Sequence, residues 1–562
     1  MSRSISKAKL RMSGMMERPL LLSSILMHAE SAFPYQGIVA RQPDGTKARV
    51  TFPEFSNRCR RVAGNLDAKL NIKPGEMVAT LAWNSLENFE LYFAIPGIGA
   101  VCHTLNLRYP DDQLVYVLNK ARNRVIFTEA DQLSRVLSLA DRCPDLEIVV
   151  VIDSLPEKLA GKIRILEYAD LYDEKHTILQ WPEFDERAAS SLCYSSGSTG
   201  NPKGALYSHR STVLYCLTGL ASGLTSITPE ATVLPAVPMF HVNGWCKAHQ
   251  ALIAGAKLIL PGSQMSGESL VDLLDDEKVT VAFGVPTIWS SYFEHLKRIN
   301  QRPKTLCTVG LGGGTPTKGL LKTIREEFGL EHCTGFGMTE TTTGIGAGFY
   351  APELHSMTAE EQTESGQKQR PFFGIEIRAR QENEELAARD DSSAGELECR
   401  GHFVISEYFE DNEATADCLT DDGWFKTGDV ISMDPEGRFR VVDRLKDMIK
   451  SGGEWISSQA LESAASSHPE VIEAAVIGLP HPRWTERPLM LLRASEGVNL
   501  DTDSIRTLLK KQVPSWWIPE AIVLVDTIPH ATTGKIDKKH LRAAYSHWHY
   551  NDSGNVVVSE NK

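Results

Sequence analysis

The segment YSSGSTGNPKG, at residues 194–204, places three glycines, four serine or threonine hydroxyls and one lysine within eleven positions. Glycine lets the backbone turn tightly, so that its N–H groups can approach an anion. Hydroxyl side chains add hydrogen-bond donors, and Lys203 adds a positive charge suited to phosphate. The segment therefore predicts a phosphate-binding loop, whose hydroxyls are those of Ser195, Ser196, Ser198 and Thr199.

The order of residues separates this loop from two other glycine-rich motifs. A Walker loop ends in Gly-Lys-Ser/Thr, whereas Lys203 is followed by Gly204 and Ala205. A nucleophile elbow has the pattern Gly-x-Ser-x-Gly, which the segment lacks. A purely structural turn is the ordinary explanation of a short glycine- and serine-rich stretch, but the length and order of this one favour phosphate binding.

Outward from the loop, short apolar runs alternate with segments that carry leucine and isoleucine at helical spacing. Such alternation predicts parallel strands joined by helical crossovers, which is an α/β architecture. A polar stretch at 382–395 is expected to be a surface turn between strands. The predicted strands are 124–129, 147–152, 257–262 and 280–286, and the predicted helices include 268–279 and 317–329.

The pattern changes near residues 443–457, where charged residues and a Gly-Gly pair follow the strand-like run GRFRVV. The segments after this point predict a compact α+β unit of about one hundred residues, with a boundary close to Lys446. Its expected elements are helices at 457–467 and 503–512 and strands at 472–480 and 521–526.

Length and composition narrow the class of protein. A chain of 562 residues is too long to fold around a single hydrophobic core, since domains average about 150 residues. The formal net charge of −13 disfavours a nucleic-acid binder. Ten scattered cysteines without a CxxC pair favour reduced thiols and a cytoplasmic location, and disfavour structural zinc or a disulfide framework. No apolar stretch approaches the length of a membrane span.

Five ordered motifs together resemble the adenylate-forming superfamily, which includes acyl-CoA synthetases, luciferases and the adenylation domains of peptide synthetases. The resemblance covers roughly residues 20–545 and is closest to medium- and long-chain fatty acyl-CoA synthetases and methylthiopropionate-CoA ligases. The motifs are YSSGSTGNPKG (194–204), GFGMTETT (335–342), KTGD (426–429), DRLKDMIKSGGEWIS (443–457) and TTGKIDKKHLR (532–542).

The resemblance implies a domain organisation and a two-step reaction. It implies an extension at 1–19, a large α/β domain of several subdomains at 20–443, a hinge at 444–450 and a small mobile α+β domain at 451–562. In the reaction, a carboxylate attacks the α-phosphate of ATP and releases pyrophosphate, after which the CoA thiol attacks the acyl carbon. ATP, Mg²⁺ and CoA are thus the expected cofactor and cosubstrates.

The resemblance also implies roles for individual residues. Lys535 would contact the carboxylate and the α-phosphate, Thr339 would bind the α-phosphate, and Asp429 would accept the ribose hydroxyls with Arg444 beside it. Glu340 and Thr199 would hold Mg²⁺. The β- and γ-phosphates and the adenine would be bound by Ser195, Ser198, Thr199, Gly200, Lys203, Gly313, Gly314, Thr315, Gly335 and Phe336.

The acyl pocket and the CoA side are the remaining expectations from the resemblance. His241 would lie near the reacting carboxylate. Rotation about Lys446 would withdraw Lys535 and bring Lys450 and the SGGEW segment to CoA. The pattern of the family differs at two places, where this chain has an extra glycine at 312–314 and Gly244 beside Trp245. The acyl chain length that relatives accept is therefore not extended to this protein. The expected pocket residues are Val242, Gly244, Trp245, Gly312 and Gly337.

Three activities remain open at this point. The first is an acyl-CoA ligase that uses a fatty or other aliphatic carboxylic acid, and a homodimer is compatible with it. The second is an acyl-adenylate-dependent amide ligase that passes the acyl group to an amine. The third is a non-catalytic nucleotide or acyl binder, which the joint presence of Lys203, Glu340, Asp429 and Lys535 disfavours. The basic N-terminal stretch is either a targeting segment or a plain extension.

Overall fold

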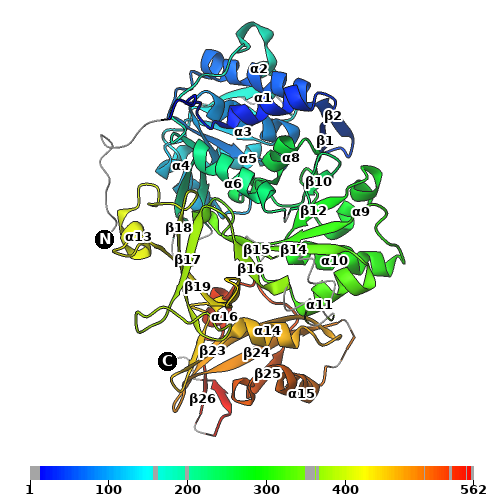
Figure 1. Cartoon of the computed structure of the whole chain (residues 1–562), viewed down its shortest axis with the longest axis vertical. Helices are drawn as coiled ribbons and strands as arrows, with labels where there is room; N and C mark the ends of the chain where they lie inside the picture. The colour runs from blue at the N-terminus through cyan, green and yellow to red at the C-terminus, as the bar shows by residue number, and fades with distance from the viewer. Residues whose placement is uncertain are drawn as a thin grey trace.

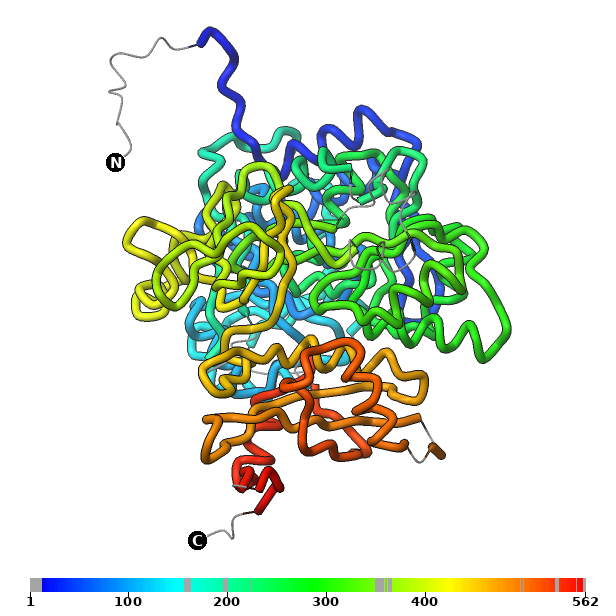
Figure 2. The backbone as a smooth tube through the Cα atoms, turned by 60° about the horizontal axis from the view of Figure 1, so that its bottom comes forward, coloured from blue at the N-terminus to red at the C-terminus, as the bar shows by residue number. Residues whose placement is uncertain are grey.

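A computed structural model describes residues 13–155, 163–195, 201–223, 225–348, 358, 361, 366–495, 497–498, 500–530, 535–551 and 553–558. A large N-terminal part occupies the top and middle of Figure 1, and a smaller C-terminal part, coloured orange to red, lies below it. The same separate small lobe is visible after rotation in Figure 2. None of the helices in the described ranges is long and apolar enough to cross a membrane.

A seven-stranded sheet leads into the predicted phosphate-binding loop. Its strands are parallel except for the last pair, β8 and β9, which form an antiparallel hairpin around residues 195–203. Helices α2 (Phe52–Leu70), α3 (Leu86–Gly97), α4 (Asp111–Lys120) and α5 (Ala130–Leu139) belong to this part of the chain. The strand order is β7 (Arg164–Glu167), β6 (Ile148–Val151), β5 (Val125–Thr128), β3 (Met77–Leu81), β4 (Val101–Thr104), β8 (Ala189–Tyr194) and β9 (Gly204–Ser208).

A thirteen-stranded sheet carries most of the remaining site. Its central strands from β14 to β1 are parallel, and the strands from β17 to β15 pair antiparallel. The order is β17 (Ile375–Arg380), β18 (Ala394–Gly401), β19 (Phe425–Met433), β20 (Phe439–Arg444), β16 (Gln369–Pro371), β15 (Gly346–Gly348), β14 (Glu331–Phe336), β13 (Thr308–Leu311), β12 (Val281–Gly284), β10 (Thr232–Pro235), β11 (Lys257–Leu260), β1 (Gly37–Arg41) and β2 (Lys47–Thr51).

Two hydrophobic cores cover the two faces of the parallel strands in this sheet. One face carries Val281 and Phe283 and packs on α8 (Lys247–Ala254), α1 (Leu22–Ala32) and α2. The other carries Ala282 and Val309 and packs on α9 (Gly267–Asp276) and α10 (Pro286–Arg298). Alternate residues of a strand point to opposite faces, which explains the near-continuous apolar runs of the sequence.

Local signals in the sequence explain where the longest helix begins and ends. Thr51 accepts a hydrogen bond from the backbone N–H of Glu54, and the Glu54 carboxylate accepts one from the backbone N–H of Thr51. This capping box satisfies two donors that the helix itself leaves free. Pro53 lies in the first turn, and Asn71 ends α2 in the left-handed conformation.

The small C-terminal part is an α+β unit, as its sequence predicts. Strands β23 (Val471–His481) and β24 (Thr485–Ala494) form a long antiparallel pair, to which β25 (Ala521–Leu524) adds in parallel. The sheet continues through β21 (Ile449–Ser451) to β22 (Glu454–Ile456). Its helices are α14 (Ser458–Ala465), α15 (Thr502–Gln512) and α16 (Lys538–Ala544), and a last hairpin joins β26 (Trp548–Tyr550) to β27 (Val556–Val558).

The structure confirms the predicted strands and most of the predicted helices, with one difference. The helix expected over 317–329 is split into α11 (Lys318–Lys322) and a π-helical turn at Thr323–Glu327. In that turn the N–H of Phe328 donates to the carbonyl of Thr323, five residues back. Periodicity of apolar residues does not distinguish such a turn from an α-helix. Residues 381–393 connect β17 to β18, so the stretch 382–395 lies between strands as expected, apart from its last two residues, which begin β18.

Candidate active site

The predicted phosphate-binding loop connects the end of β8 to the start of β9. The backbone N–H of Ser195 donates to the carbonyl of Lys203 at 2.8 Å, so the two ends of the loop are joined. The Lys203 ammonium lies 5.1 Å from the ring centroid of Tyr408. Residues 196–200, which include the predicted phosphate ligands Ser198, Thr199 and Gly200, lie outside the described residues.

Glu340 is a buried carboxylate beside the loop. It lies in the short 3-10 helix Thr339–Thr341 and is 5% exposed. The Tyr408 hydroxyl donates to Glu340 Oε1 at 2.7 Å, and the Tyr207 hydroxyl donates to the Thr339 carbonyl at 2.5 Å. Burial raises the pKa of Glu340, and the hydrogen bond from Tyr408 opposes that rise. Tyr408 thus connects Lys203 to Glu340, a role that no local pattern of the sequence indicates.

The backbone after Glu340 is held in a conformation that β-branched residues rarely adopt. Thr342 has φ of 46° and Thr343 has φ of 99°. A Cβ on Gly337 would lie 1.7 Å from the carbonyl oxygen of Thr343, so only glycine fits there. Backbone strain of this kind persists where the surrounding structure enforces it, and it is common at active sites.

The predicted adenine slot and the indole of Trp245 lie against one another. A Cβ on Gly312 would meet Trp245 Cη2 at 3.0 Å, and a Cβ on Gly313 would meet Trp245 Cζ2 at 3.4 Å. Gly313, Gly314 and Thr315 are exposed, as a nucleotide-binding edge requires. Phe336 is half-buried, and its ring packs edge-on against Phe439. The same ring can therefore both pack in the protein and stack on a base.

Trp245 is presented by a left-handed turn. Every residue from Val242 to Cys246 has a positive φ, between 49° and 59°. Asn243, which tolerates this conformation, secures the turn: its Nδ2 donates to Ser191 Oγ at 2.9 Å and its Oδ1 accepts from Cys193 Sγ at 3.3 Å. His241 precedes the turn and is half-buried. The tolerance of Asn for positive φ was the signal in the sequence that could have revealed Asn243 as a positioning residue.

Asp429 is a buried carboxylate with one oxygen paired and, within the described part of the chain, one oxygen without a partner. It is 2% exposed. Its Oδ1 lies 2.9 Å from Arg444 Nε, and no described residue forms a hydrogen bond with its Oδ2. Burial raises the pKa of Asp429, whereas Arg444 lowers it. A buried acceptor left without a partner is costly unless a ligand supplies a donor, so the site fits a ribose that carries two hydroxyls.

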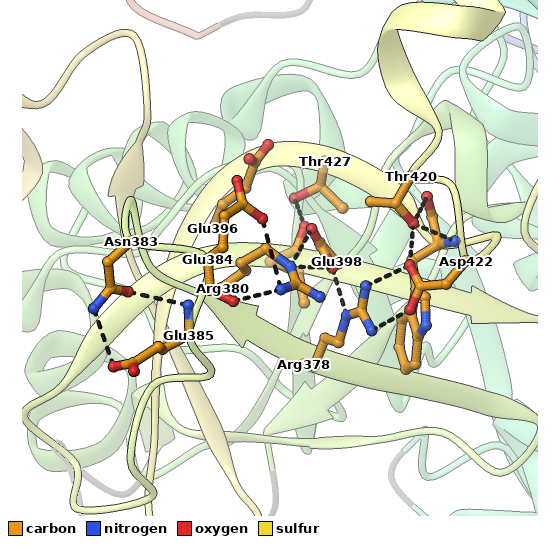
Figure 3. A network of polar contacts seen from close by, with 12 residues as sticks. Arg378, Arg380, Asn383, Glu384, Glu385, Glu396, Glu398, Thr420, Asp422 and Thr427 are labelled. Atoms are coloured by element: carbon orange, nitrogen blue, oxygen red, sulfur yellow. Dashed lines mark hydrogen bonds and ion pairs between the residues drawn. The ribbon is translucent and has the colours of Figure 1, made fainter.

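A polar network in which Arg378 and Arg380 of β17 pair with Glu398 of β18 lies beside β19, the strand that carries Asp429 (Figure 3). The Thr427 hydroxyl donates to the Leu397 carbonyl at 2.8 Å, and the N–H of Gly428 donates to Glu396 Oε1 at 3.1 Å. Gly428 has φ of 71°, which favours glycine, and the register of β18 and β19 shifts beside it. The resulting irregularity directs Asp429 to the interior of the site.

Lys535 from the small domain acts on the same buried charges of the large domain. Protein around its ammonium lowers the pKa of Lys535 to about 8, chiefly through burial and then through Arg444, while Asp429 and Glu340 oppose that shift. The residue as a whole keeps solvent-exposed surface. Desolvation of the ammonium and the positive charges of Arg444 and Lys446 all lower the pKa of Lys535. The structure thus brings Lys535, Asp429, Arg444 and Glu340 together.

Lys446 lies in a turn between the two domains. The turn Leu445–Asp447 follows β20 and is closed by the N–H of Asp447, which donates to the Arg444 carbonyl at 2.8 Å. Lys450 contacts Glu382 and Trp455: its ammonium lies 3.4 Å from Glu382 Oε1 and 4.9 Å from the ring centroid of Trp455.

Several side-chain contacts cross between the domains beside this turn, and three of them involve Gln459, Lys450 and Ser458. Gln459 Nε2 donates to Thr315 Oγ1, Lys450 pairs with Glu382, and the Ser458 hydroxyl donates to Asp443 Oδ2 at 2.7 Å. These contacts fix the small domain in the arrangement that places Lys535 at the site. The predicted domain limits at 443 and 451 and the hinge role of Lys446 stay predictions.

The described residues fit a magnesium ion that arrives with a phosphate ligand. No group of three or more His, Cys, Asp or Glu side chains in the described ranges forms a metal site of its own. Mg²⁺ commonly takes one or two carboxylates, with substrate phosphates and waters completing the shell. The buried Glu340 would supply one such carboxylate. The second predicted ligand, Thr199, lies outside the described residues.

Comparison with known proteins gives matches along nearly the whole chain. Residues 30–409 match the family of AMP-binding enzymes, and residues 460–535 match the AMP-binding enzyme C-terminal domain. The chain is 38% identical to the 3-methylmercaptopropionyl-CoA ligase of Ruegeria lacuscaerulensis, over 94% of this chain and 98% of that one. It is 37% identical to the long-chain-fatty-acid–CoA ligase of Thermus thermophilus, over 96% and 98%.

A similar fold is found among solved structures. The crystal structure of the anthranilate CoA ligase AuaEII in complex with anthranoyl-AMP superposes with a TM-score of 0.83, over 94% of this chain and 98% of that chain. The two sequences are 22% identical, so this likeness concerns the fold alone.

Proposed function

The chain belongs to the AMP-binding enzyme family and is an acid–CoA ligase of it, and on that premise we propose that it converts an aliphatic carboxylic acid first to an acyl-AMP and then to an acyl-CoA. In the first step a carboxylate oxygen attacks the α-phosphate of ATP, and the bond to pyrophosphate breaks. In the second step the CoA thiol attacks the acyl carbon, AMP leaves and the thiol proton is released. The observation that carries the proposal is the position of Lys535 beside Asp429 and Arg444.

Lys535 suits the first step because both reactants are anions. A positive charge between the acid and the α-phosphate offsets their repulsion, and it stabilises the charge that develops on the phosphoryl oxygens. Asp429 Oδ2 would accept hydrogen bonds from the ribose and so fix the nucleotide relative to Lys535. Lys203 and the hydroxyls of its loop would bind the phosphates that leave. Mg²⁺, held by Glu340 and the phosphates, would offset phosphate charge.

The second step requires Lys535 to leave the site so that CoA can reach the acyl carbon. Rotation about Lys446 would do this, because the lysine lies on the small domain and the nucleotide on the large one. The rotation would break the Gln459–Thr315 and Ser458–Asp443 contacts. Lys450 would separate from Glu382 and become available to CoA.

The proposal is tested by pyrophosphate release from MgATP with straight-chain acids of graded length, in the presence of CoA, of an amine, or of neither. We expect acid-dependent release in every case, and a thioester only when CoA is present. Release that yields acyl-AMP and an amide but no thioester would replace CoA by an amine as the acceptor. Absence of release with every acid would leave a nucleotide or acyl binder.

A further inference from the structure

Lys247 is a buried lysine that none of the steps above uses. It is the first residue of α8 and is 7% exposed. Its ammonium donates to Gln250 Oε1 at 2.9 Å and lies 4.8 Å from the ring centroid of Phe283. Burial lowers the pKa of Lys247, and the groups that oppose the shift are the thiols of three cysteines rather than any carboxylate: Cys216, Cys246 and Cys333.

Three other lysines whose side chains are partly buried are paired with carboxylates. Lys257 lies 3.0 Å from Glu277, Lys368 lies 2.7 Å from Asp391, and Lys538 lies 2.7 Å from Glu462. Within the described ranges no such ion pair is found for Lys247.

A buried ammonium without a counter-ion is unfavourable. Its place at the first position of a helix adds repulsion from the positive end of the helix dipole. Both effects would be relieved by a bound anion.

Lys247 lies on the face of the thirteen-stranded sheet that leads to Trp245. Phe283 on β12 belongs to the core of this face, and Cys333 on β14 packs against the same core. Gly335, two residues after Cys333, points to the same side as Cys333. Along β14 the residues of this side, namely Glu331, Cys333 and Gly335, are exposed or half-buried, whereas His332 and Thr334 on the other side are buried.

The distance between Cys333 and Gly335 along β14 indicates how long an acid between Trp245 and Lys247 could be. Cys333 and Gly335 are about 7 Å apart, because a strand rises about 3.3 Å per residue. Gly335 belongs to the predicted nucleotide slot, and Cys333 is a neighbour of the Lys247 ammonium. A carboxylic acid whose reacting end lies at Trp245 would therefore bring its far end toward Lys247 after a short chain.

We propose that Lys247 binds an anionic group at the far end of the substrate, so that the enzyme selects short dicarboxylic acids over simple fatty acids of the same length. The proposal rests on the function proposed above and specifies its substrate class. A second carboxylate would supply the missing counter-ion of Lys247, and a methyl end would leave the ammonium buried and unpaired. An interaction of this kind discriminates strongly, because the wrong substrate forfeits a desolvated charge pair.

The test compares acids of equal length with and without a terminal carboxylate: glutarate with valerate, and adipate with hexanoate. For the wild-type enzyme we expect kcat/KM of acid-dependent pyrophosphate release to favour the diacid by about 30-fold or more. Lys247→Met should abolish or reverse this preference while pyrophosphate release with valerate persists. Lys247→Arg keeps the charge and should retain part of the preference. Lys297→Met, which removes an exposed lysine paired with Glu327, is the matched control and should change nothing.

Binding is measured separately from catalysis by the melting temperature of the full chain. Glutarate should raise the melting temperature of the wild-type protein and of Lys297→Met, and should leave that of Lys247→Met unchanged. That pattern without any pyrophosphate release would support the role of Lys247 and refute the proposed reaction. The role of Lys247 would be overturned if the wild-type enzyme preferred valerate to glutarate, or preferred acids with a neutral hydroxyl or keto group at the far end to diacids. It would also be overturned if Lys247→Met lost kcat/KM equally with both acids.

Discussion

Replacing Lys535 with alanine is expected to slow acyl-AMP formation by about 10²–10³-fold, since removal of one preorganised donor to a developing oxyanion typically costs that much. The ammonium lies among Arg444, Asp429 and Glu340, where burial has already lowered its pKa to about 8. A pKa of about 8 keeps Lys535 mostly protonated at neutral pH, and its ammonium is already desolvated before acyl-AMP formation begins. The measurement is pre-steady-state formation of acyl-AMP and pyrophosphate without CoA.

The second half-reaction separates this role from a general loss of structure. Thioester formation from supplied acyl-AMP should stay within about threefold of wild type in Lys535→Ala, because the lysine is withdrawn in that step. Lys539→Ala removes an exposed lysine of α16 and is the matched control. An equal loss in both half-reactions would contradict the assignment.

The pH dependence of adenylation supplies a further control on Lys535. The protonated form is the active one, so kcat/KM in wild type should fall as the pH rises through about 8. Lys535→Arg keeps its charge at high pH, and its residual activity should lose this alkaline decline. The same decline in both proteins would assign it to another group.

Asp429→Asn is expected to raise the KM for ATP by about 10–100-fold, because a hydrogen bond to a charged group contributes roughly 1.5–3 kcal/mol. The free Oδ2 of Asp429 can accept from a ribose hydroxyl, and its ion pair with Arg444 holds it in place. An amide cannot accept at both positions and no longer pairs with Arg444. The KM for the carboxylic acid should change little.

A nucleotide that lacks a ribose hydroxyl tests whether Asp429 acts through the ribose. Deoxy-ATP should be a poor substrate for wild type, and Asp429→Asn should show little further loss with it, as expected for two changes that remove one interaction. Asp434→Asn is the matched control, because Asp434 is also buried and ion-paired but with Arg438 and Lys368. Additive losses for Asp429→Asn and deoxy-ATP would place the ribose elsewhere.

Much of the fold and the chemistry class follow from local patterns in the sequence. The apolar runs at 147–152 and 257–262 are strands because parallel strands are buried on both faces. The five ordered motifs resemble the adenylate-forming superfamily, and the comparisons confirm that resemblance, the two-domain fold and the AMP-forming acyl-CoA ligase class.

Other features depend on contacts between residues far apart in the chain. Tyr408 reaches Glu340 across 68 positions, and the place of Lys247 near Cys333 depends on how α8 packs on the thirteen-stranded sheet. The sequence offers no periodicity or spacing that encodes either contact. The π-helical turn at Thr323–Glu327 was missed for a different reason, since its apolar pattern is that of an α-helix.

The central claim, that a carboxylate attacks the α-phosphate of ATP in this site, is tested most directly with an acid whose carboxylate carries ¹⁸O. If the acyl-AMP forms and CoA then cleaves the acyl–oxygen bond, one labelled oxygen must remain on AMP. We predict singly labelled AMP, unlabelled pyrophosphate and an acyl-CoA in equal amounts, observed by mass spectrometry of a single turnover. Label in inorganic phosphate with formation of ADP, or AMP without label, would contradict the account.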